Sequence, residues 1–249
     1  MRNINILTDP HIHTLASVHA YSTINECVQF ACEKGLQGIA ITDHAKRPPN
    51  GDLGYFQHFF NLRVIPPYVN GVRVLRGAEV DIVDLDGTLV FTNEIMEMFQ
   101  LEVVIASVHP DVPIGKPWET ISQHTKAYIN VLENLYVDIL GHSGTPEFSY
   151  DIDEVLLCAK KLDKMIEINN STFMVRPQSR ENCRKIALRC KELGVFITVG
   201  SDAHACYSVG QFDTAVEMLA EIDFPEELIA NISLKRFVSI LNKRKNILL

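Results

Sequence analysis

The chain has 249 residues, of which 47% are hydrophobic and 22% are charged, and its formal net charge is −8. This length suits a single domain over residues 1–249, and closed α/β barrels often have this size. Proteins that bind a nucleic acid backbone usually carry basic surfaces. The acidic balance therefore argues against a nucleic acid partner.

The six cysteines include no CxxC pair, which favours reduced thiols over a disulfide framework. No apolar stretch approaches membrane-spanning length, and the short apolar run 4–7 soon meets Asp9, unlike the core of a signal peptide. The sequence thus predicts a cytoplasmic protein with no membrane partner. A homo-oligomer is compatible with it.

Short apolar runs alternate with helical patterns along the whole chain. We expect strands at 4–7, 38–42, 72–78, 103–108, 137–140, 165–168 and 195–199. We expect helices at 24–35, after a capping box at 23–26, and at 93–99, 118–132, 151–162, 180–193, 211–220 and 233–243. The stretch 45–67 is loop-like with one short helix, and Asp86-Gly87 predicts a hairpin turn. About seven βα units predict a parallel sheet, closed or distorted into a barrel at this length.

Histidines and carboxylates follow the ends of these predicted strands. The candidates are His11, His13, His19, His44, Glu79, His109, His142, Asp202 and His204. His11 and His13 point to one face of an extended chain, and in (β/α) barrels the C-terminal ends of the strands carry the active site. His124 is expected to be a solvated helix residue. His58, in the aromatic stretch 55–60, either lines the mouth of the site or packs in a small core cluster.

These nine donors exceed the needs of one metal ion, because a catalytic zinc commonly takes about three protein ligands. They suggest two or three metals. A carboxylate can bridge two cations, so Glu79 is the candidate bridge. The imidazole-rich set suits zinc, manganese or iron, with zinc as the first expectation. Asp9 and Asp43 either orient imidazoles or cap strand ends.

At these residues the sequence resembles the PHP family, named for polymerase and histidinol phosphatase, and within it the YcdX-like probable phosphatases. The motifs are Asp9-x-His11-x-His13, His19, Thr42-Asp43-His44, Glu79, His109-Pro110, His142, Glu167-Ile168-Asn169-Asn170-Ser171, Gly200-Ser201-Asp202-x-His204 and Asp223-Phe224-Pro225. Two positions depart from the family pattern. Pro10 stands where a small or apolar residue is usual, and Ser143 stands where the YcdX-like proteins tend to have proline.

The resemblance implies the PHP fold, a distorted (β/α)7 TIM-like barrel with a trinuclear metal centre. It assigns one metal to His11, His13, Glu79 and Asp202, a second to Glu79, His109 and His142, and a third to His19, His44 and His204. The expected reaction is hydrolysis of a small phosphomonoester, with a metal-bound hydroxide rather than a side chain as the nucleophile.

Arginine recognises phosphate well, so Arg63 and Arg176 are the candidate substrate contacts, with Lys46 and Arg47 as further basic residues. Four other functions stay open. The chain could be a phosphodiesterase or nuclease, or a histidinol phosphatase of the same family. It could also be an amidohydrolase, or a non-catalytic metal-binding PHP domain.

Overall fold

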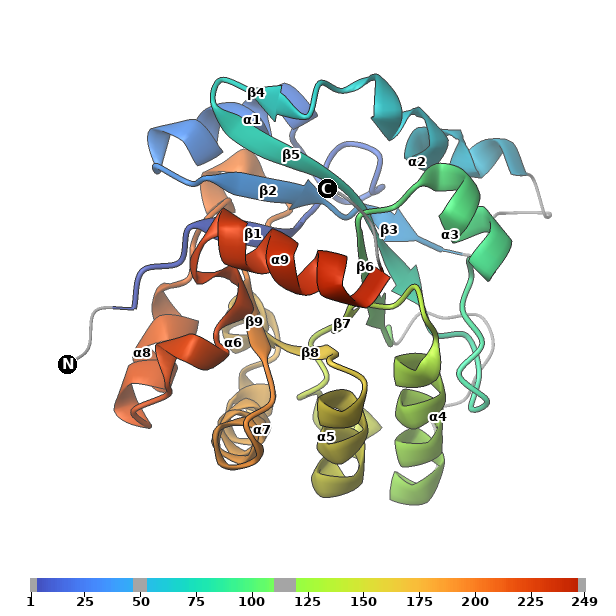
Figure 1. Cartoon of the computed structure of the whole chain (residues 1–249), viewed down its shortest axis with the longest axis vertical. Coiled ribbons are helices and arrows are strands. Elements are labelled where there is room, and N and C mark those ends of the chain that lie inside the picture. The colour runs from blue at the N-terminus through green and yellow to red at the C-terminus, as the bar shows by residue number, and fades with distance from the viewer. Residues whose placement is uncertain (1–3, 47–52, 110–119, 246–249) are drawn as a thin grey trace.

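Seven parallel strands form a nearly closed barrel in the computed structural model, which describes residues 4–46, 53–109 and 120–245 (Figure 1). In barrel order they are β1 (Thr8–Ile12), β2 (Gly38–Ile41), β5 (Val72–Asp81), β6 (Val103–Ser107), β7 (Ile139–Leu140), β8 (Met165–Asn169) and β9 (Ile197–Gly200). The ring closes where Ile12 bridges Ala203, and the amide of His13 donates to the Ala203 carbonyl at 2.8 Å. The predicted α/β barrel is confirmed.

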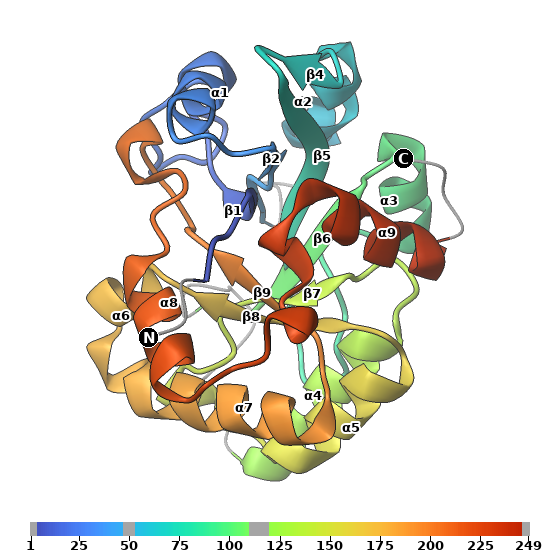
Figure 2. The same cartoon turned by 60° about the vertical axis from the view of Figure 1, so that its left-hand side comes forward.

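Helices surround this barrel (Figures 1 and 2). They are α1 (Ile24–Glu33), α2 (Gln57–Asn61), α3 (Asn93–Phe99), α4 (Ile121–Glu133), α5 (Ile152–Lys161), α6 (Thr172–Val175), α7 (Arg180–Leu193), α8 (Asp213–Glu221) and α9 (Leu234–Lys245). The capping box is present at α1, where the Thr23 side chain accepts from the Glu26 amide and Glu26 accepts from the Thr23 amide. A helix whose first amides are satisfied in this way begins at a defined residue.

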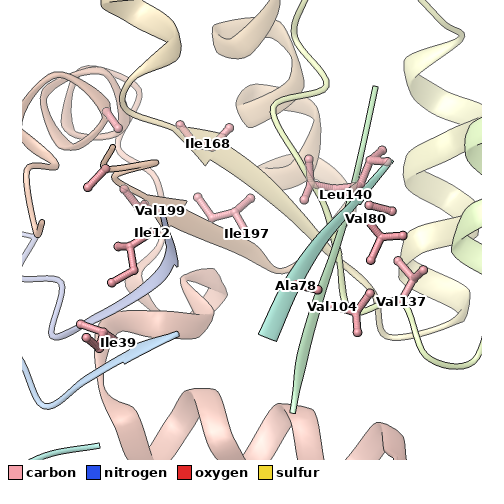
Figure 3. Packing of buried hydrophobic residues seen from close by; sticks show 14 of the residues in the cluster. Ile12, Ile39, Ala78, Val80, Val104, Val137, Leu140, Ile168, Ile197 and Val199 are labelled. Atoms are coloured by element: carbon pink, nitrogen blue, oxygen red, sulfur yellow. The ribbon is translucent and has the colours of Figure 1, made fainter. Parts of the chain in front are cut away.

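The main core lies between the strands and the helices outside them. Alternate residues of each strand face outward, so Val80, Val104 and Val199 share one buried cluster with helix residues such as Val28 and Val155. Figure 3 shows the strand side of this cluster. The other alternate residues of each strand face the barrel interior, and they are buried as well.

The C-terminal helix α9 seals one end of the barrel (Figure 2). Its Phe237 and Leu241 are fully buried against Leu75, Val103 and other inward-facing residues from the N-terminal parts of the strands. Apolar packing thus fills that end of the barrel interior. Polar inward-facing residues are left at the opposite end.

The structure corrects several predicted boundaries. The first strand is not 4–7 but Thr8–Ile12, and β5 continues to Asp81 rather than ending at 78. In both cases polar residues beyond the predicted end belong to the strand, because they face the barrel interior. The predicted helix at 118–132 is α4, and residues 118 and 119 lie outside the described part of the chain.

Three short elements were not predicted. They are β3 (His44–Ala45), which pairs with β5, the antiparallel edge strand β4 (Tyr68–Val69), and α6. A tight turn is present at Asp86-Gly87, where the amide of Val83 donates to the carbonyl of Thr88, but a single bridge between Ile82 and Leu89 replaces a longer hairpin. Among the described residues, no helix is long and apolar enough to cross a membrane.

Candidate metal centre

The inward-facing residues change from apolar to polar along each strand. In β5, Leu75 lies in the interior cluster near α9, whereas Glu79 and Asp81, on the same face, lie towards the C-terminal end. In β8, Met165 is followed on the same face by Glu167 and Asn169. The open end of the barrel is therefore lined by buried polar side chains.

All nine predicted donors lie at this end of the barrel. The imidazoles of His11, His13, His109 and His142 and the carboxylate of Glu79 are buried, and His19 and His204 lie nearer the surface. A cavity of about 560 Å³ opens above them. The donors His19, His44, His109, His142, Asp202 and His204 are among the residues that line it.

Four side chains form a first group of donor atoms. Nε2 of His11 lies 3.1 Å from Nε2 of His13 and 3.5 Å from Oε2 of Glu79. Oδ1 of Asp202 lies 3.6 Å from the His11 nitrogen and 3.0 Å from the His13 nitrogen. Ligands of one tetrahedral zinc ion are about 3.3 Å apart at the usual bond lengths. Donor atoms of His11, His13 and Glu79 thus lie within 4.8 Å of one another, and Asp202 approaches both imidazoles closely enough to share an ion with them.

The other oxygen of Glu79 belongs to a second group. Oε1 of Glu79 lies 2.9 Å from Nε2 of His142 and 3.4 Å from Nε2 of His109. One carboxylate therefore faces two groups of imidazoles, one with each oxygen. This is the arrangement that a bridging ligand requires.

A third group lies nearer the surface. Nε2 of His19 and Nε2 of His204 are 2.9 Å apart, and the His44 ring stacks on the His19 ring with 5.0 Å between centroids. Donor atoms of His13, His44 and His204 also lie within 4.8 Å of one another. His13 is thus shared between the first and third groups, a link that the motif-based division does not contain.

Hydrogen bonds to Nδ1 hold several of these imidazoles in one orientation. Nδ1 of His11 donates to Oε1 of Glu167 at 2.7 Å, and Nδ1 of His109 donates to Oδ1 of Asp81 at 2.8 Å. Nδ1 of His204 donates to a backbone carbonyl at 3.0 Å. With the proton fixed on Nδ1, the lone pair of Nε2 points into the centre, as metal ligation requires.

Glu167 is the carboxylate that strand-end reasoning did not select. Besides His11, it accepts from the amide of His142 at 2.9 Å and from Nδ2 of Asn169 at 3.2 Å. A methyl group at Gly200 would collide with Oε1 of Glu167 and approach Cβ of His11 to 2.9 Å, so only glycine fits there. The sequence signal for Glu167 was its position as a carboxylate within an otherwise apolar strand.

Asp43 acts through a serine. Ser17 donates its hydroxyl proton to Oδ1 of Asp43 at 2.7 Å and accepts from Nδ1 of His13 at 3.2 Å. The same carboxylate accepts from the amide of Thr14 at 2.6 Å and from Nε2 of His58 at 2.8 Å. Asp43 therefore orients an imidazole, one of the two roles we considered for it.

Asp9 has the other role. Its carboxylate accepts from the amides of Ser201 and Gly210 at 3.1 and 2.9 Å, and within the described part of the chain no imidazole donates to it. Burial, opposed by these hydrogen bonds, raises the pKa of Asp9 to about 6. Asp9 thus caps backbone amides where the barrel closes.

The carboxylates and imidazoles shift each other's ionisation. Burial alone would raise the pKa of Glu79, but the neighbouring His109, His11 and His44 hold it well below its usual range. Burial would lower the pKa of His109, but Glu79 and Asp81 raise it to about 10. Burial lowers the pKa of His13 to about 3, against the effect of the neighbouring Asp202 carboxylate. The centre thus concentrates negative charge on the carboxylates that face the imidazoles.

Several buried atoms of the centre have no hydrogen-bond partner among the described residues. They are Oε2 of Glu79, Oδ1 of Asp202 and both ring nitrogens of His44, although Nδ1 of His44 lies 2.7 Å from Oε2 of Glu79 without hydrogen-bond geometry. Leaving such atoms unpaired is costly. Nitrogen and carboxylate donors suit zinc and related divalent ions, so the residues fit a metal centre.

Two donors also have a left-handed backbone, which is uncommon for residues other than glycine. Asp202 has φ of 52° and His142 has φ of 22°. The amide of Asp202 is held by the carbonyl of His11 at 2.9 Å, and that of His142 by Glu167. Backbone conformations of this kind cluster at functional sites because the surrounding structure must hold them in place.

The predicted phosphate contacts divide. Arg176 and Lys46 line the cavity. The charge of Arg176 reaches the donors, because it helps burial and His109 to lower the pKa of His142, against the effect of Glu79. Arg63 is exposed, stacks on Phe60 at 3.6 Å and lines a separate cleft, so it is not near the donors. Although Arg63 follows the aromatic stretch in the sequence, it does not lie at the mouth of the barrel. Arg47 lies outside the described residues.

The two remaining histidines have structural partners. His124 is buried and its Nδ1 donates to the carbonyl of Ser149 at 2.6 Å, so the expectation of a solvated side chain was wrong. The helix α4 turns this residue inward. His58, in the aromatic stretch, donates to Asp43 and packs edge-on against Phe59, so it joins the aromatic cluster and is not among the residues that line the cavity. Phe56 and Phe59 pack edge-on against Phe91 and belong to the core.

Comparison with known proteins agrees with this architecture. The PHP domain family profile matches residues 9–174. A probable phosphatase of Acetivibrio thermocellus is 43% identical over 242 residues, covering 97% of this chain and 98% of that protein. A probable phosphatase of Caldanaerobacter subterraneus subsp. tengcongensis is 45% identical over 246 residues, covering 98% and 94%.

Among solved structures, the histidinol phosphate phosphatase of Lactococcus lactis, complexed with zinc, L-histidinol and phosphate, has a TM-score of 0.61 at 21% identity, covering 88% of this chain and 94% of that one. The fold and the donor cluster define the class as an α/β barrel with a candidate metal centre. The chain belongs to the PHP family. The predicted family and the predicted enzyme class, a phosphoesterase, are thus confirmed.

Proposed function

We propose that this protein is a metal-dependent phosphatase that hydrolyses small phosphomonoesters with three divalent metal ions, zinc first among them. The observation that carries the proposal is the convergence of nine donors at the open end of the barrel, with Glu79 facing two groups at once. Partnerless buried oxygens on Glu79 and Asp202 support it.

In this proposal the first ion is held by His11, His13, Glu79 and Asp202. The second is held by Glu79, His109 and His142, and the third by His19, His44 and His204. When bound, such ions polarise phosphoryl oxygens, activate water and stabilise the leaving oxygen. Glu167, Asp81 and the pair Ser17–Asp43 keep the imidazoles in the required tautomer.

Arg176 and Lys46 supply positive charge on the cavity wall. Arg176 is partly buried there, and a guanidinium can bind two phosphate oxygens at once. The cavity of about 560 Å³ suits a small ligand. The net charge of −8 gives no support to binding a long polyanion.

The test combines metal content with hydrolysis. Protein purified without chelator is expected to carry about three metals per chain if the donors divide as proposed. It should hydrolyse 4-nitrophenyl phosphate faster than bis(4-nitrophenyl) phosphate. Asp202→Ala should lower metal content and hydrolysis together, whereas Asp86→Ala, an exposed carboxylate paired with Lys126, should change neither. Full activity in protein stripped of metal would refute the proposal, and a preference for the diester would make the protein a phosphodiesterase.

A further inference from the structure

We propose that the substrate class is phosphomonoesters whose leaving group is apolar and uncharged, recognised by Tyr21, Met174 and Val175 at the mouth of the cavity. This inference rests on the proposed phosphatase function. It is carried by the unusual surface of the mouth, by the rigidity of its walls and by the distribution of charge around it.

Large apolar side chains are exposed around this mouth. Tyr21, Met174 and Val175 line the cavity and are 78%, 79% and 64% exposed. Exposed apolar side chains at the rim of a cavity mark a ligand surface more often than isolated ones do. Because they are exposed whereas most of the donors are buried, they would face the part of the substrate that points away from the phosphate.

The wall formed by α6 is held in place. The amide and hydroxyl of Thr172 both donate to Oδ1 of Asn169, at 2.9 and 3.2 Å. Nδ2 of Asn169 donates to Oδ2 of Asp202 at 3.2 Å. Two consecutive amides, of Met174 and Val175, donate to the carbonyl of Ser171. The exposed side chains of α6 thus sit on a turn connected to a proposed metal ligand, so its backbone needs little ordering on binding.

The part of the lining that carries Tyr21 is connected in a similar way. The amide of Tyr21 donates to the carbonyl of His204 at 2.8 Å, which joins the loop after β1 to the loop after β9. Tyr21 and the α6 side chains thus all belong to segments tied to the donor cluster. An apolar group that contacts both segments would lose water from more of its surface than one that contacts a single segment.

Charge around the mouth argues against a cationic leaving group. Among the described residues that line the cavity, Arg176 and Lys46 are the cations besides imidazoles, and Asp202 is the one carboxylate. Asp202 already faces His11 and His13. An ammonium group on the leaving alcohol would therefore meet Arg176 without a compensating carboxylate on these walls.

The experiment compares alcohol leaving groups of similar basicity. Hydrolysis of each ester consumes one water, breaks the phosphorus–oxygen ester bond and releases inorganic phosphate and the alcohol. The substrates are 2-phenylethyl phosphate, ethyl phosphate and histidinol phosphate, and the readout is kcat/KM for the full chain reconstituted with Zn²⁺ or Mn²⁺. We expect 2-phenylethyl phosphate to exceed each of the other two by about tenfold or more, the size of discrimination that an apolar contact gives.

The variants are Met174→Ser and Tyr21→Ser, with Met98→Ser as the matched control. Met98 is 61% exposed on α3 and does not line the cavity. The ratio of kcat/KM for 2-phenylethyl phosphate over ethyl phosphate should fall in both test variants, mainly through KM, and stay as in the parent protein in the control. Equal turnover of the two esters by the parent protein, or an unchanged ratio in both test variants, would overturn the inference while leaving the phosphatase intact. Failure to hydrolyse any of the three esters with either metal would instead count against the proposed function.

Discussion

Replacing Glu167 by glutamine tests whether a residue outside the donor set controls the metal centre. The change keeps the size of the side chain but converts one carboxylate oxygen into an NH₂ group. Both oxygens of Glu167 accept hydrogen bonds, one from His11 and the other from His142 and Asn169. In Glu167→Gln, one of these donors must therefore face another donor.

The magnitude follows from what these bonds hold. Loss of an outer partner that orients a ligating imidazole typically lowers metal affinity by about 10–100-fold, or about 1.4–2.8 kcal/mol. A buried hydrogen bond to a charged acceptor such as Glu167 also contributes about 1.5–3 kcal/mol to the free energy of unfolding of the metal-free protein. We therefore expect Glu167→Gln to lower both zinc affinity and the free energy of unfolding.

The assay is competition for Zn²⁺ against a chromophoric chelator, with urea unfolding of the metal-free protein measured alongside. Asp138→Asn is the control, because Asp138 is also a fully buried carboxylate and accepts from the amide of Val104 at 2.8 Å, outside the cavity lining. The control should lose stability without losing zinc affinity. If Glu167→Gln binds zinc as tightly as the parent protein, Glu167 supports only the fold and the orientation argument fails.

Two further substitutions and one chemical modification test other parts of the structure. Ser17→Ala removes the acceptor for Nδ1 of His13, so zinc affinity should fall by about tenfold; unchanged affinity in the same chelator assay would contradict this. Gly200→Ala places a methyl group where none fits, so the free energy of unfolding measured in urea should fall by about 1–3 kcal/mol. An unchanged free energy of unfolding would contradict this. Burial raises the pKa of the Cys183 thiol to about 12, which leaves little thiolate at pH 8. Brief treatment with iodoacetamide should therefore modify the exposed Cys32 before Cys183, as followed by mass spectrometry. Early modification of Cys183 would show that the core opens readily.

Local patterns in the sequence determined the order of strands and helices. The alternation of apolar and polar residues, the capping box at Thr23 and the glycine turns act over a few neighbouring residues, so they can be interpreted without the rest of the chain. Strand ends were less certain. Asp9 and His11 seemed to follow β1 but belong to it, because a barrel strand is buried on both faces and a polar residue need not end it.

The candidate donors could likewise be named from the sequence, because each lies close to or beyond the C-terminal end of a strand and such positions meet at one rim. Only the tertiary structure decided which acceptors hold their Nδ1 atoms, since Glu167 and His11 are 156 residues apart and meet through the register of the closing barrel. It also separated Arg176, on the cavity wall, from Arg63, on Phe60. These contacts depend on how distant strands and loops pack in three dimensions, and residue type and local spacing do not encode that packing.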